Sequence, residues 1–289
     1  MAAAYGALLD AVRGMHWPAR RAVSHPVAGT QPSRLRGASG DFSEYRLYRQ
    51  GDDPRRIDWR LLGRSDRAYV RVVSDRAMLP TTIVMDCSAS MAFPVPTRAK
   101  WRLACEIAIG LAAIAHGDGD PVGVAIPMAR GYARLVSPRT RRGLVGEIVR
   151  VLESAEPGGV EPLAPTVASI RSQRIVIITD MLGDATELLR AGGVLAAAGT
   201  EVHAVHIIAN EEIDPPRRTI LAADPERPDV KRLLTDSARR EYDAAFSEWR
   251  GEVRRRWRAA GTWYNQVTTD EPSPRAVRRI VTHGGGSAR

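Results

Sequence analysis

Three short apolar runs of β-forming residues constrain the fold of this 289-residue chain most strongly. They are Thr81–Met85, Arg174–Thr179 and Glu201–Ile208, and the first two are followed directly by Asp86 and Asp180. Short runs that are apolar at almost every position are typical of strands buried on both faces of a sheet. Because segments of helical periodicity separate them, the sequence predicts an α/β fold with a mostly parallel sheet flanked by helices.

The other periodic segments fit the same architecture. Helices are predicted over residues 2–12, 100–116, 140–155, 184–198 (capped by Asp184) and 274–281, and in a long segment whose apolar stripe is Leu234, Ala238, Tyr242, Phe246, Trp249, Val253 and Trp257. Further strands are predicted over residues 68–73, 121–128, 131–136 and 262–267, with the middle two forming an antiparallel pair near a sheet edge. We interpret the stripe of the long helix as core packing.

Composition shifts suggest three parts. Residues 1–79 are expected to form an N-terminal extension packed on the main domain, residues 80–210 the core, and residues 211–289 a C-terminal helix, last strand and flexible tail. Within the extension, residues 1–39 are rich in Arg, Pro, Gly and Ser, and we interpret them as a lead-in draped over the surface.

Composition also excludes several classes of protein. Hydrophobic residues at 44%, charged residues at 26% and a mean hydropathy of −0.24 are ordinary for a soluble globular protein. The longest nearly apolar stretch, residues 103–115, is too short to span a membrane. The N-terminus lacks the basic region of a secretory signal, and Cys87 and Cys105 alone cannot build a disulfide framework. We therefore expect a cytoplasmic protein without membrane insertion.

The net charge of +9 is compatible with acidic partners, including nucleic acid. Of the 42 basic residues only Lys100 and Lys231 are lysines, so 40 are arginines, which pair well with carboxylates and phosphates. No RNA-recognition signature, zinc finger or long basic run is visible. A basic surface is therefore a better interpretation than a nucleic-acid site, and the arginines of residues 250–258 are expected on the solvent side of their helix.

Asp86 and Asp180 end two predicted parallel strands, so both should lie at the carboxyl edge of the sheet, where α/β folds bind ligands. Asp86 opens an Asp-x-Ser-x-Ser loop that directs Ser88 and Ser90 to the same side. One carboxylate and two hydroxyls are hard oxygen donors that suit Mg²⁺ and leave room for an incoming carboxylate. Without a metal, the same residues would make a cap and loop hydrogen bonds.

Residues 40–59 combine aromatic side chains with dense opposite charges. The aromatics, which are Phe42, Tyr45, Tyr48 and Trp59, are expected to bury against a domain. The charges are expected to pair among themselves or to cap a turn. We favour a structural role that locks the N-terminal region to the sheet. The alternative is a partner-binding surface made of Asp52, Asp53, Arg55, Arg56, Asp58 and Trp59.

An apolar strand followed by Asp-x-Ser-x-Ser-Met resembles the metal-ion-dependent adhesion site of von Willebrand factor A domains. Upstream, Arg-Leu-Tyr at residues 46–48, Gly-Asp-Asp-Pro-Arg-Arg-Ile-Asp-Trp at 51–59 and Tyr-Val-Arg at 69–71 resemble the signature of the DUF58 family. The similarity covers roughly residues 30–210. It implies a von Willebrand A-like fold in bacterial cytoplasmic proteins that work beside MoxR-type AAA+ ATPases.

The resemblance assigns metal ligation to Asp86, Ser88, Ser90 and Asp180. The threonine that completes the site in the family would fall near residues 161–163, where this chain has Glu-Pro-Leu. Thr166 is close in sequence but one helical turn further on. Glu161 would add a negative charge that weakens the attraction of the ion for a partner's acid.

The leading hypothesis is a non-enzymatic adaptor for protein complex assembly or maturation. Its metal site would capture an acidic residue of a MoxR-type ATPase or of its client. A metal-dependent hydrolase is one alternative, but phosphohydrolases with an aspartate nucleophile place a second aspartate where this chain has Ser88. His203 and His206 should face opposite sides of a strand and share no metal. A basic nucleic-acid-binding protein is the other alternative.

Overall fold

A computed structural model gives the fold. It describes residues 5–20, 28–32, 41–50, 54–65, 67–74, 76–128, 132–183, 185–216, 220–223 and 231–283. The chain divides into a main unit, Met1–Arg20 with Pro80–Arg289, and an inserted unit, Arg21–Leu79. The expected extension is thus shared between the two units, and the three-part division of the chain stays a prediction.

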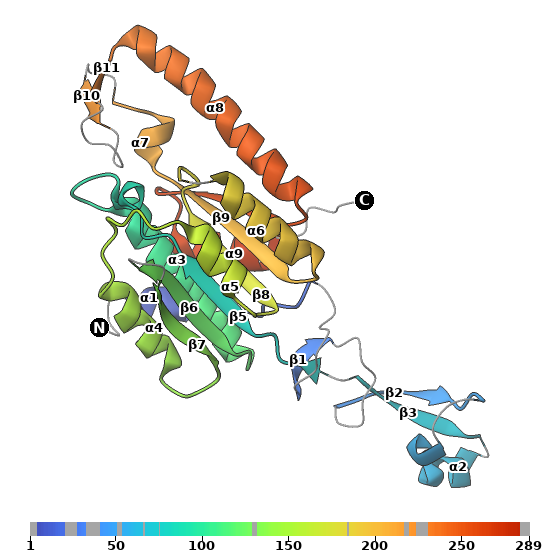
Figure 1. Ribbon diagram of the computed structural model, residues 1–289. Coiled ribbons are helices and arrows are strands. Elements are labelled where there is room, and N and C mark those ends of the chain that lie inside the picture. Colours follow the sequence, from blue (N-terminus) through green and yellow to red (C-terminus); the bar gives the residue numbers. More distant parts are fainter. Residues whose placement is uncertain are drawn as a thin grey trace. The chain divides into compact units, whose positions relative to one another are not determined.

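The main unit is built on a six-stranded sheet of order β12, β9, β8, β5, β6, β7 (Figure 1). The strands are β5 (Thr81–Met85), β6 (Val122–Met128), β7 (Tyr132–Arg139), β8 (Arg174–Thr179), β9 (Glu201–Ile208) and β12 (Trp263–Thr268). Every neighbouring pair is parallel except β6 with β7 at one edge. The predicted mostly parallel sheet and its antiparallel edge pair are confirmed.

Helices cover both faces of this sheet. One face carries α1 (Gly6–Val12), α3 (Ala99–Gly117), α4 (Leu144–Glu153) and α9 (Ser273–His283). The other carries α5 (Leu163–Ser169), α6 (Ala185–Ala197) and α8 (Asp236–Ala259). No helix in the described part of the chain combines the length and the apolar character that a membrane crossing requires. The seven-residue α5 is too short to show a helical period, and only the family resemblance implied a helix that opens near residues 161–163.

The core forms two layers because side chains alternate across each strand. Ile83 and Met85 of β5 pack on the α3 side, whereas Val84 packs on the α6 side. All residues of β5, β8 and β9 are buried, as expected for strands covered on both faces. Each large apolar side chain removed from water contributes roughly 1.5–3 kcal/mol, so these two layers stabilise the strands whose carboxyl ends carry Asp86 and Asp180.

The segment after α1 is anchored in the core, which corrects the expected surface lead-in for its described residues. Trp17 is fully buried, with the guanidinium carbon of Arg174 4.0 Å from its ring centroid. The carboxylate of Glu201 accepts hydrogen bonds from Arg174 Nε at 2.8 Å, from the backbone N–H of Arg20 at 2.7 Å, and from His203 Nε2, also at 2.8 Å. This buried network ties the chain to the amino-terminal edge of the sheet.

The apolar stripe of α8 is core packing only in its second half. Val253 and Trp257 are buried, whereas Tyr242, Phe246 and Trp249 are half-buried and stack with ring centroids 5.3 and 5.4 Å apart. Before α8, the chain forms α7 (Asn210–Ile213) and a small antiparallel pair, β10 (Ile220–Ala223) with β11 (Lys231–Leu234). The predicted cap Asp184, the side chain of Leu234 and the predicted tail lie outside the described residues.

The described residues of the inserted unit form two antiparallel strand pairs and a short helix. Its elements are β1 (Ala28–Pro32) with β4 (Arg76–Ala77), β2 (Asp41–Leu47) with β3 (Tyr69–Ser74), η1 (Pro54–Arg56) and α2 (Trp59–Ser65). Asp58 caps α2, because its Oδ1 accepts from the N–H groups of Arg60 and Leu61 at 3.0 Å. Trp59 is 64% exposed, so its expected burial is wrong.

The rest of the charged block is only partly described. Asp52 and Asp53 lie outside the described residues, as does the side chain of Arg56, while Arg55 is exposed. The cap formed by Asp58 is a contact within the inserted unit, and the ring of Trp59 is exposed. Both interpretations of the charged block stay predictions.

Candidate functional site

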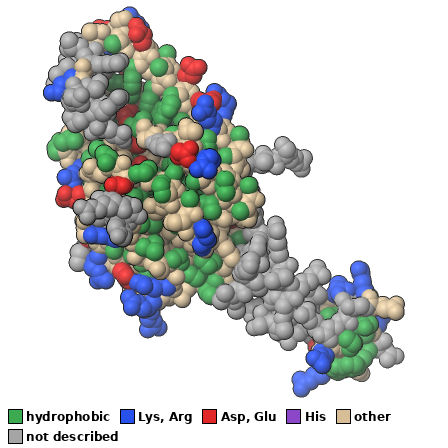
Figure 2. All heavy atoms as spheres, viewed as in Figure 1, with side chains coloured by type: hydrophobic (Ala, Val, Ile, Leu, Met, Phe, Trp, Pro, Cys, Tyr) green, Lys and Arg blue, Asp and Glu red, His purple; other side chains and the backbone are tan. Residues whose placement is uncertain are grey.

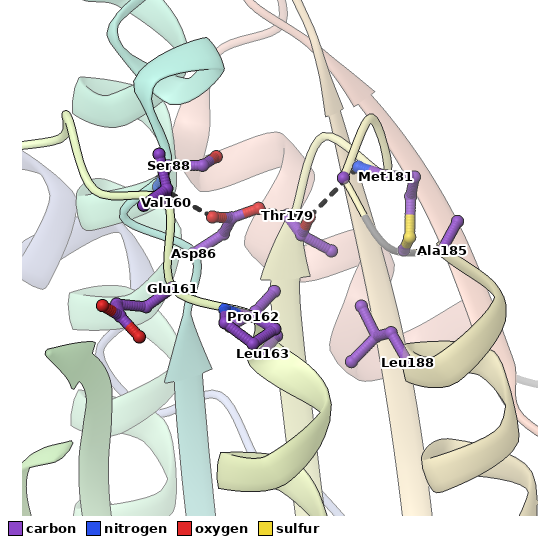
Figure 3. Close-up of a pocket in the computed structure, with 11 residues that line it drawn as sticks. Asp86, Ser88, Val160, Glu161, Pro162, Leu163, Thr179, Met181, Ala185 and Leu188 are labelled. Atoms are coloured by element: carbon purple, nitrogen blue, oxygen red, sulfur yellow. Dashed lines mark hydrogen bonds between the residues drawn. The ribbon is translucent and has the colours of Figure 1, made fainter. Parts of the chain in front are cut away.

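Two aspartates meet at the carboxyl edge of the sheet, where the sequence places them. Asp86 follows β5 and Asp180 follows β8, and the Asp86 N–H donates to the carbonyl of Ile178 at 2.9 Å. Both carboxylates are buried. Figure 3 shows Asp86 between Ser88 and Thr179.

The loop after Asp86 gathers its hydroxyls beside the carboxylate. The N–H of Ser88 donates to Asp86 Oδ1 at 2.9 Å, and the Oγ atoms of Ser88 and Ser90 are 3.0 Å apart. A parallel bridge between Ser88 and Gly159 holds the loop against the segment that leads into α5. This contact is a hydrogen bond between the two hydroxyls, which is the loop hydrogen bond expected without a metal. Adjacent ligands of an octahedral Mg²⁺ ion are also about 3 Å apart, so the same arrangement fits a bound ion.

Thr179, which sequence reasoning missed, orients the Asp86 carboxylate. Its Oγ1 donates to Asp86 Oδ2 at 2.6 Å and accepts from the N–H of Met181 at 3.1 Å. Burial and the charge of Asp180 raise the pKa of Asp86, while hydrogen bonds from Thr179 and Ser88 oppose that rise. The only hint in the sequence is that a hydroxyl ends the strand just before Asp180.

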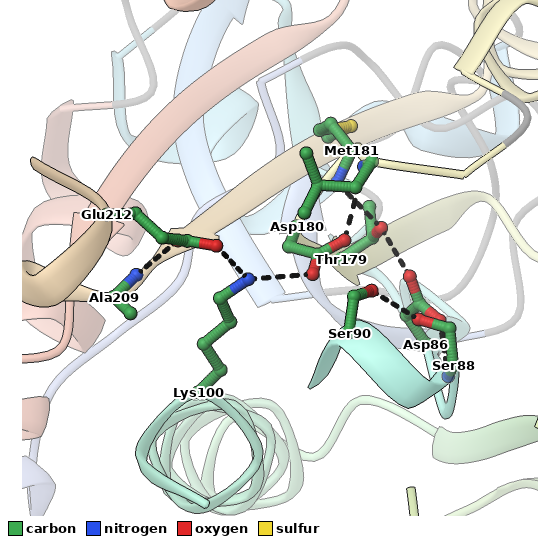
Figure 4. Close-up of polar contacts among 10 residues, drawn as sticks. Asp86, Ser88, Ser90, Lys100, Thr179, Asp180, Met181, Ala209 and Glu212 are labelled. Carbon is green, nitrogen blue, oxygen red and sulfur yellow. Dashed lines mark hydrogen bonds and ion pairs between the residues drawn. The ribbon is translucent and has the colours of Figure 1, made fainter. Parts of the chain in front are cut away.

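A buried lysine, also missed, occupies the other side of the site. Lys100 of α3 extends its Nζ to Asp180 Oδ2 at 2.9 Å and to Glu212 Oε1 at 2.5 Å (Figure 4). Burial alone would lower the pKa of Lys100, but the two carboxylates outweigh burial and raise it, so the lysine is charged at neutral pH. The available signal was its rarity, since the chain has only one other lysine.

The charges of this cluster do not cancel. Asp86, Asp180 and Glu212 are three carboxylates, and Lys100 supplies one positive charge, so two negative charges remain when all are ionised. Lys100 pairs with Asp180 and Glu212, whereas no described lysine or arginine pairs with Asp86. Because an unpaired buried charge is strongly unfavourable, a divalent cation held by Asp86, Ser88 and Ser90 fits the charge as well as the donor chemistry.

Asp180 is less available to an ion than its position suggests. Its Oδ2 is bound by Lys100, and its Oδ1 accepts from the N–H of Leu182 at 3.2 Å. Its inclusion among the metal ligands stays a prediction.

A pocket of about 150 Å³ opens beside Asp86. Its walls are mostly apolar and include Leu163, Met181, Ala185 and Leu188. Glu161 also lines it, but Thr166, the fourth residue of α5, does not. The structure therefore brings one of the two additional candidates, Glu161, to the pocket that Asp86 lines.

The two histidines of β9 lie apart, as predicted. His203 contacts Glu201, whereas His206 Nδ1 is 2.6 Å from the hydroxyl of Tyr264. Burial lowers the pKa of His206 to about 3, so this ring is neutral at physiological pH. No group of three or more His, Cys, Asp or Glu residues in the described ranges could hold a metal. A cation here depends on the serine hydroxyls.

The sheet order and the Asp-x-Ser-x-Ser loop define the core as a von Willebrand A-like α/β fold. The family model described as "Protein of unknown function DUF58" matches residues 44–252, and the chain belongs to this family. Two relatives, "Uncharacterized protein Rv1480" of Mycobacterium tuberculosis strain H37Rv and "Uncharacterized protein Mb1516" of Mycobacterium bovis, are each 28% identical over 287 residues. The alignments cover 95% of this chain and 89% of each relative.

Solved structures with similar folds have low sequence identity. BatB from Bacteroides thetaiotaomicron is 16% identical with a TM-score of 0.44, and the match covers 72% of this chain and all of that one. An aerotolerance-related membrane protein from Bacteroides fragilis is 17% identical with a TM-score of 0.42, covering 71% and 99%. The SpRpn10 VWA domain is 13% identical with a TM-score of 0.40, covering 73% and 100%.

Proposed function

We propose that this protein is a non-enzymatic adaptor that uses a divalent cation, Mg²⁺ by preference, to capture an acidic residue of a partner protein. The observation that carries the proposal is the buried carboxylate of Asp86, which has no cationic partner among the described residues and lies beside two serine hydroxyls 3.0 Å apart. When bound, the ion would supply electrophilic attraction for a carboxylate of the partner.

The residues at the proposed cation site have different roles. Asp86, Ser88 and Ser90 would hold the ion, and Thr179 keeps the Asp86 carboxylate in one orientation. The two hydroxyls are neutral, so they leave the ion its affinity for another acid. Asp180 contributes its charge from the Lys100 side, and Glu161 is among the residues that line the pocket beside Asp86.

We assign the partner to the class of MoxR-type AAA+ ATPases or their clients, in the cytoplasm, with a role in complex assembly or maturation. Support comes from membership of the DUF58 family and from the expectations that this resemblance carries. A second contact by the inserted unit is consistent with the exposed Trp59.

The alternatives have less support. A hydrolase of the aspartate-nucleophile type needs an acid or base two residues after Asp86, where Ser88 stands. On the face of the main unit seen in Figure 2, Lys and Arg side chains lie in separate groups rather than in one continuous stripe. A long nucleic acid would need such a stripe.

Affinity capture from the native cell extract tests the proposal. Wild-type chain with Mg²⁺ is expected to retain an AAA+ ATPase, whereas EDTA or Asp86→Ala removes it, because both eliminate the bridging ion. Asp243→Ala, which removes an exposed aspartate of α8, is the matched control and should retain the ATPase. Equal retention with Mg²⁺, with EDTA and by the Asp86 variant would contradict a metal-bridged contact.

A further inference from the structure

The pocket beside Asp86 is larger and more apolar than a bound cation needs. Its volume is about 150 Å³, and most of its wall is apolar. An apolar cavity of about 150 Å³ can hold a benzene-sized group. Figure 3 shows the α5 side of this pocket with Pro162 and Leu163, and the α6 side with Ala185 and Leu188. The pocket therefore fits one medium-sized apolar side chain.

Backbone hydrogen bonds fix the wall of the pocket that precedes α5. The N–H groups of Gly158 and Gly159 both donate to the carbonyl of Cys87 at 3.0 Å, and the N–H of Ala89 donates to the carbonyl of Gly159 at 3.2 Å. These bonds attach the segment that carries Val160 to the loop after β5. Because this wall is already ordered, a ligand pays little entropy to organise it, which favours binding.

Met181 lines the pocket with an unusual backbone conformation. Its φ is +61°, in the left-handed region that residues other than glycine seldom adopt. The N–H of Met181 donates to Thr179 Oγ1 at 3.1 Å, so the hydroxyl that orients Asp86 also holds this conformation. Strained residues are frequent at binding sites, and the flexible thioether of methionine adapts to different apolar partners.

Apolar side chains continue from the pocket onto the surface. Val160, which lines the pocket, is 81% exposed. Leu182 is 43% exposed and follows Met181, another residue of the wall. Single exposed apolar residues are normal, whereas apolar residues gathered around a pocket mark an interaction site. A partner that covers this mouth would remove both side chains from water.

We propose that the pocket takes an apolar side chain from the same partner segment whose carboxylate meets the cation. The partner motif is then one acid with a leucine-sized side chain within two positions of it. The inference rests on the proposed function, because the acid is recognised through the ion. Asp86 itself lines the pocket, and neighbouring Cα atoms of a peptide are about 3.8 Å apart, so one short segment can reach both places.

Glu161 restricts which residue can stand next to the acid. It is the second carboxylate among the residues that line the pocket, after Asp86. A further acid of the partner would be repelled there, since like charges at short range are unfavourable. The pocket therefore favours an apolar neighbour over another acid.

A phage library of peptides, with one fixed glutamate between random residues, tests the motif. Selection on the full chain with Mg²⁺ is expected to enrich leucine, isoleucine, methionine or phenylalanine at one position within two residues of the glutamate. In calorimetry with a selected synthetic peptide, alanine at that position should weaken binding by about tenfold or more, because the buried apolar area is lost.

A variant of the chain that fills the pocket gives the matching result from the other side. Ala185 is the half-buried first residue of α6 and lines the pocket, so Ala185→Leu should weaken the selected peptide by about tenfold. The alanine-substituted peptide should bind this variant and the wild type within about twofold of each other. Ala197→Leu makes the same change at the exposed last residue of α6 and should alter affinity by about twofold or less. Thermal unfolding verifies that both variants are folded.

The possible outcomes separate this inference from the proposed function. Peptides that need their glutamate and Mg²⁺ but show no apolar preference would overturn the pocket inference and leave the cation site supported. Peptides with the apolar preference that bind equally in EDTA, or equally to Asp86→Asn, would overturn the cation bridge and with it the shared motif. No enrichment by the wild type, or equal weakening by Ala185→Leu and Ala197→Leu, would also overturn the inference.

Discussion

Replacing Lys100 by methionine is expected to lower the free energy of unfolding by about 3–5 kcal/mol, the usual effect of breaking a buried ion pair from one side. The side chain is fully buried between Asp180 and Glu212, and no other described lysine or arginine pairs with these carboxylates. Methionine keeps the apolar stem but removes the charge, so the two acids are left buried together. Chemical denaturation at neutral pH measures the loss.

Lys231→Met is the natural control for this experiment, because it removes the other lysine of the chain at an exposed position. It should change stability by about 0.5 kcal/mol or less. Adding Asp180→Asn to Lys100→Met should recover part of the loss, since one of the stranded charges disappears. Wild-type stability of the Lys100 variant would show that the buried bridge does not stabilise the fold.

Glu201→Gln is expected to lower stability by about 3 kcal/mol at pH 7, with a difference from wild type that shrinks as the pH falls. Burial alone would raise the pKa of Glu201, but Arg174 and His203 outweigh it and hold the pKa at about 2. The ordinary value is 4.5, so the folded state favours the ionised form. This stabilisation is complete above pH 4.5 and is lost as the pH falls toward 2.

Denaturation curves of wild type and variant at several values between pH 7 and pH 3 check this linkage. Glu187→Gln, which breaks an exposed pair with Arg190, should change stability by about 0.5 kcal/mol or less at every pH. A constant difference between wild type and Glu201→Gln across this range would mean that ionisation of Glu201 does not stabilise the fold.

The central strands could be predicted to the residue because their signal is local. β5, β8 and β9 occupy the predicted segments, since a strand buried on both faces must be apolar along its whole length. The meeting of Asp86 and Asp180 follows from that prediction, because the carboxyl ends of adjacent parallel strands share an edge. The helices around them are shifted only at their ends.

Contacts between segments that are distant along the chain could not be predicted from the sequence. Lys100 and Asp180 are 80 residues apart, and Trp17 and Arg174 are 157 apart, so no local pattern pairs them. Periodicity tells which side of a helix is buried, but not which buried side chain meets a carboxylate. Trp17 stands alone in a segment of turn-forming and charged residues, so nothing nearby marks it as core. Trp59 shows the opposite error, because it was expected to be buried and is exposed. An aromatic residue at the start of a short helix need not be covered.

Thermal unfolding with and without Mg²⁺ tests the central claim most directly, when wild type and Asp86→Asn are compared after treatment with a chelator. Without metal, Asp86→Asn should unfold at or above the wild-type temperature, because it removes a buried charge that has no cationic partner in the described structure. At about a hundredfold excess of Mg²⁺ over its Kd, the wild type should gain about 2.7 kcal/mol and the variant nothing. Equal stabilisation of both proteins, or of neither, would contradict a cation site at Asp86, Ser88 and Ser90.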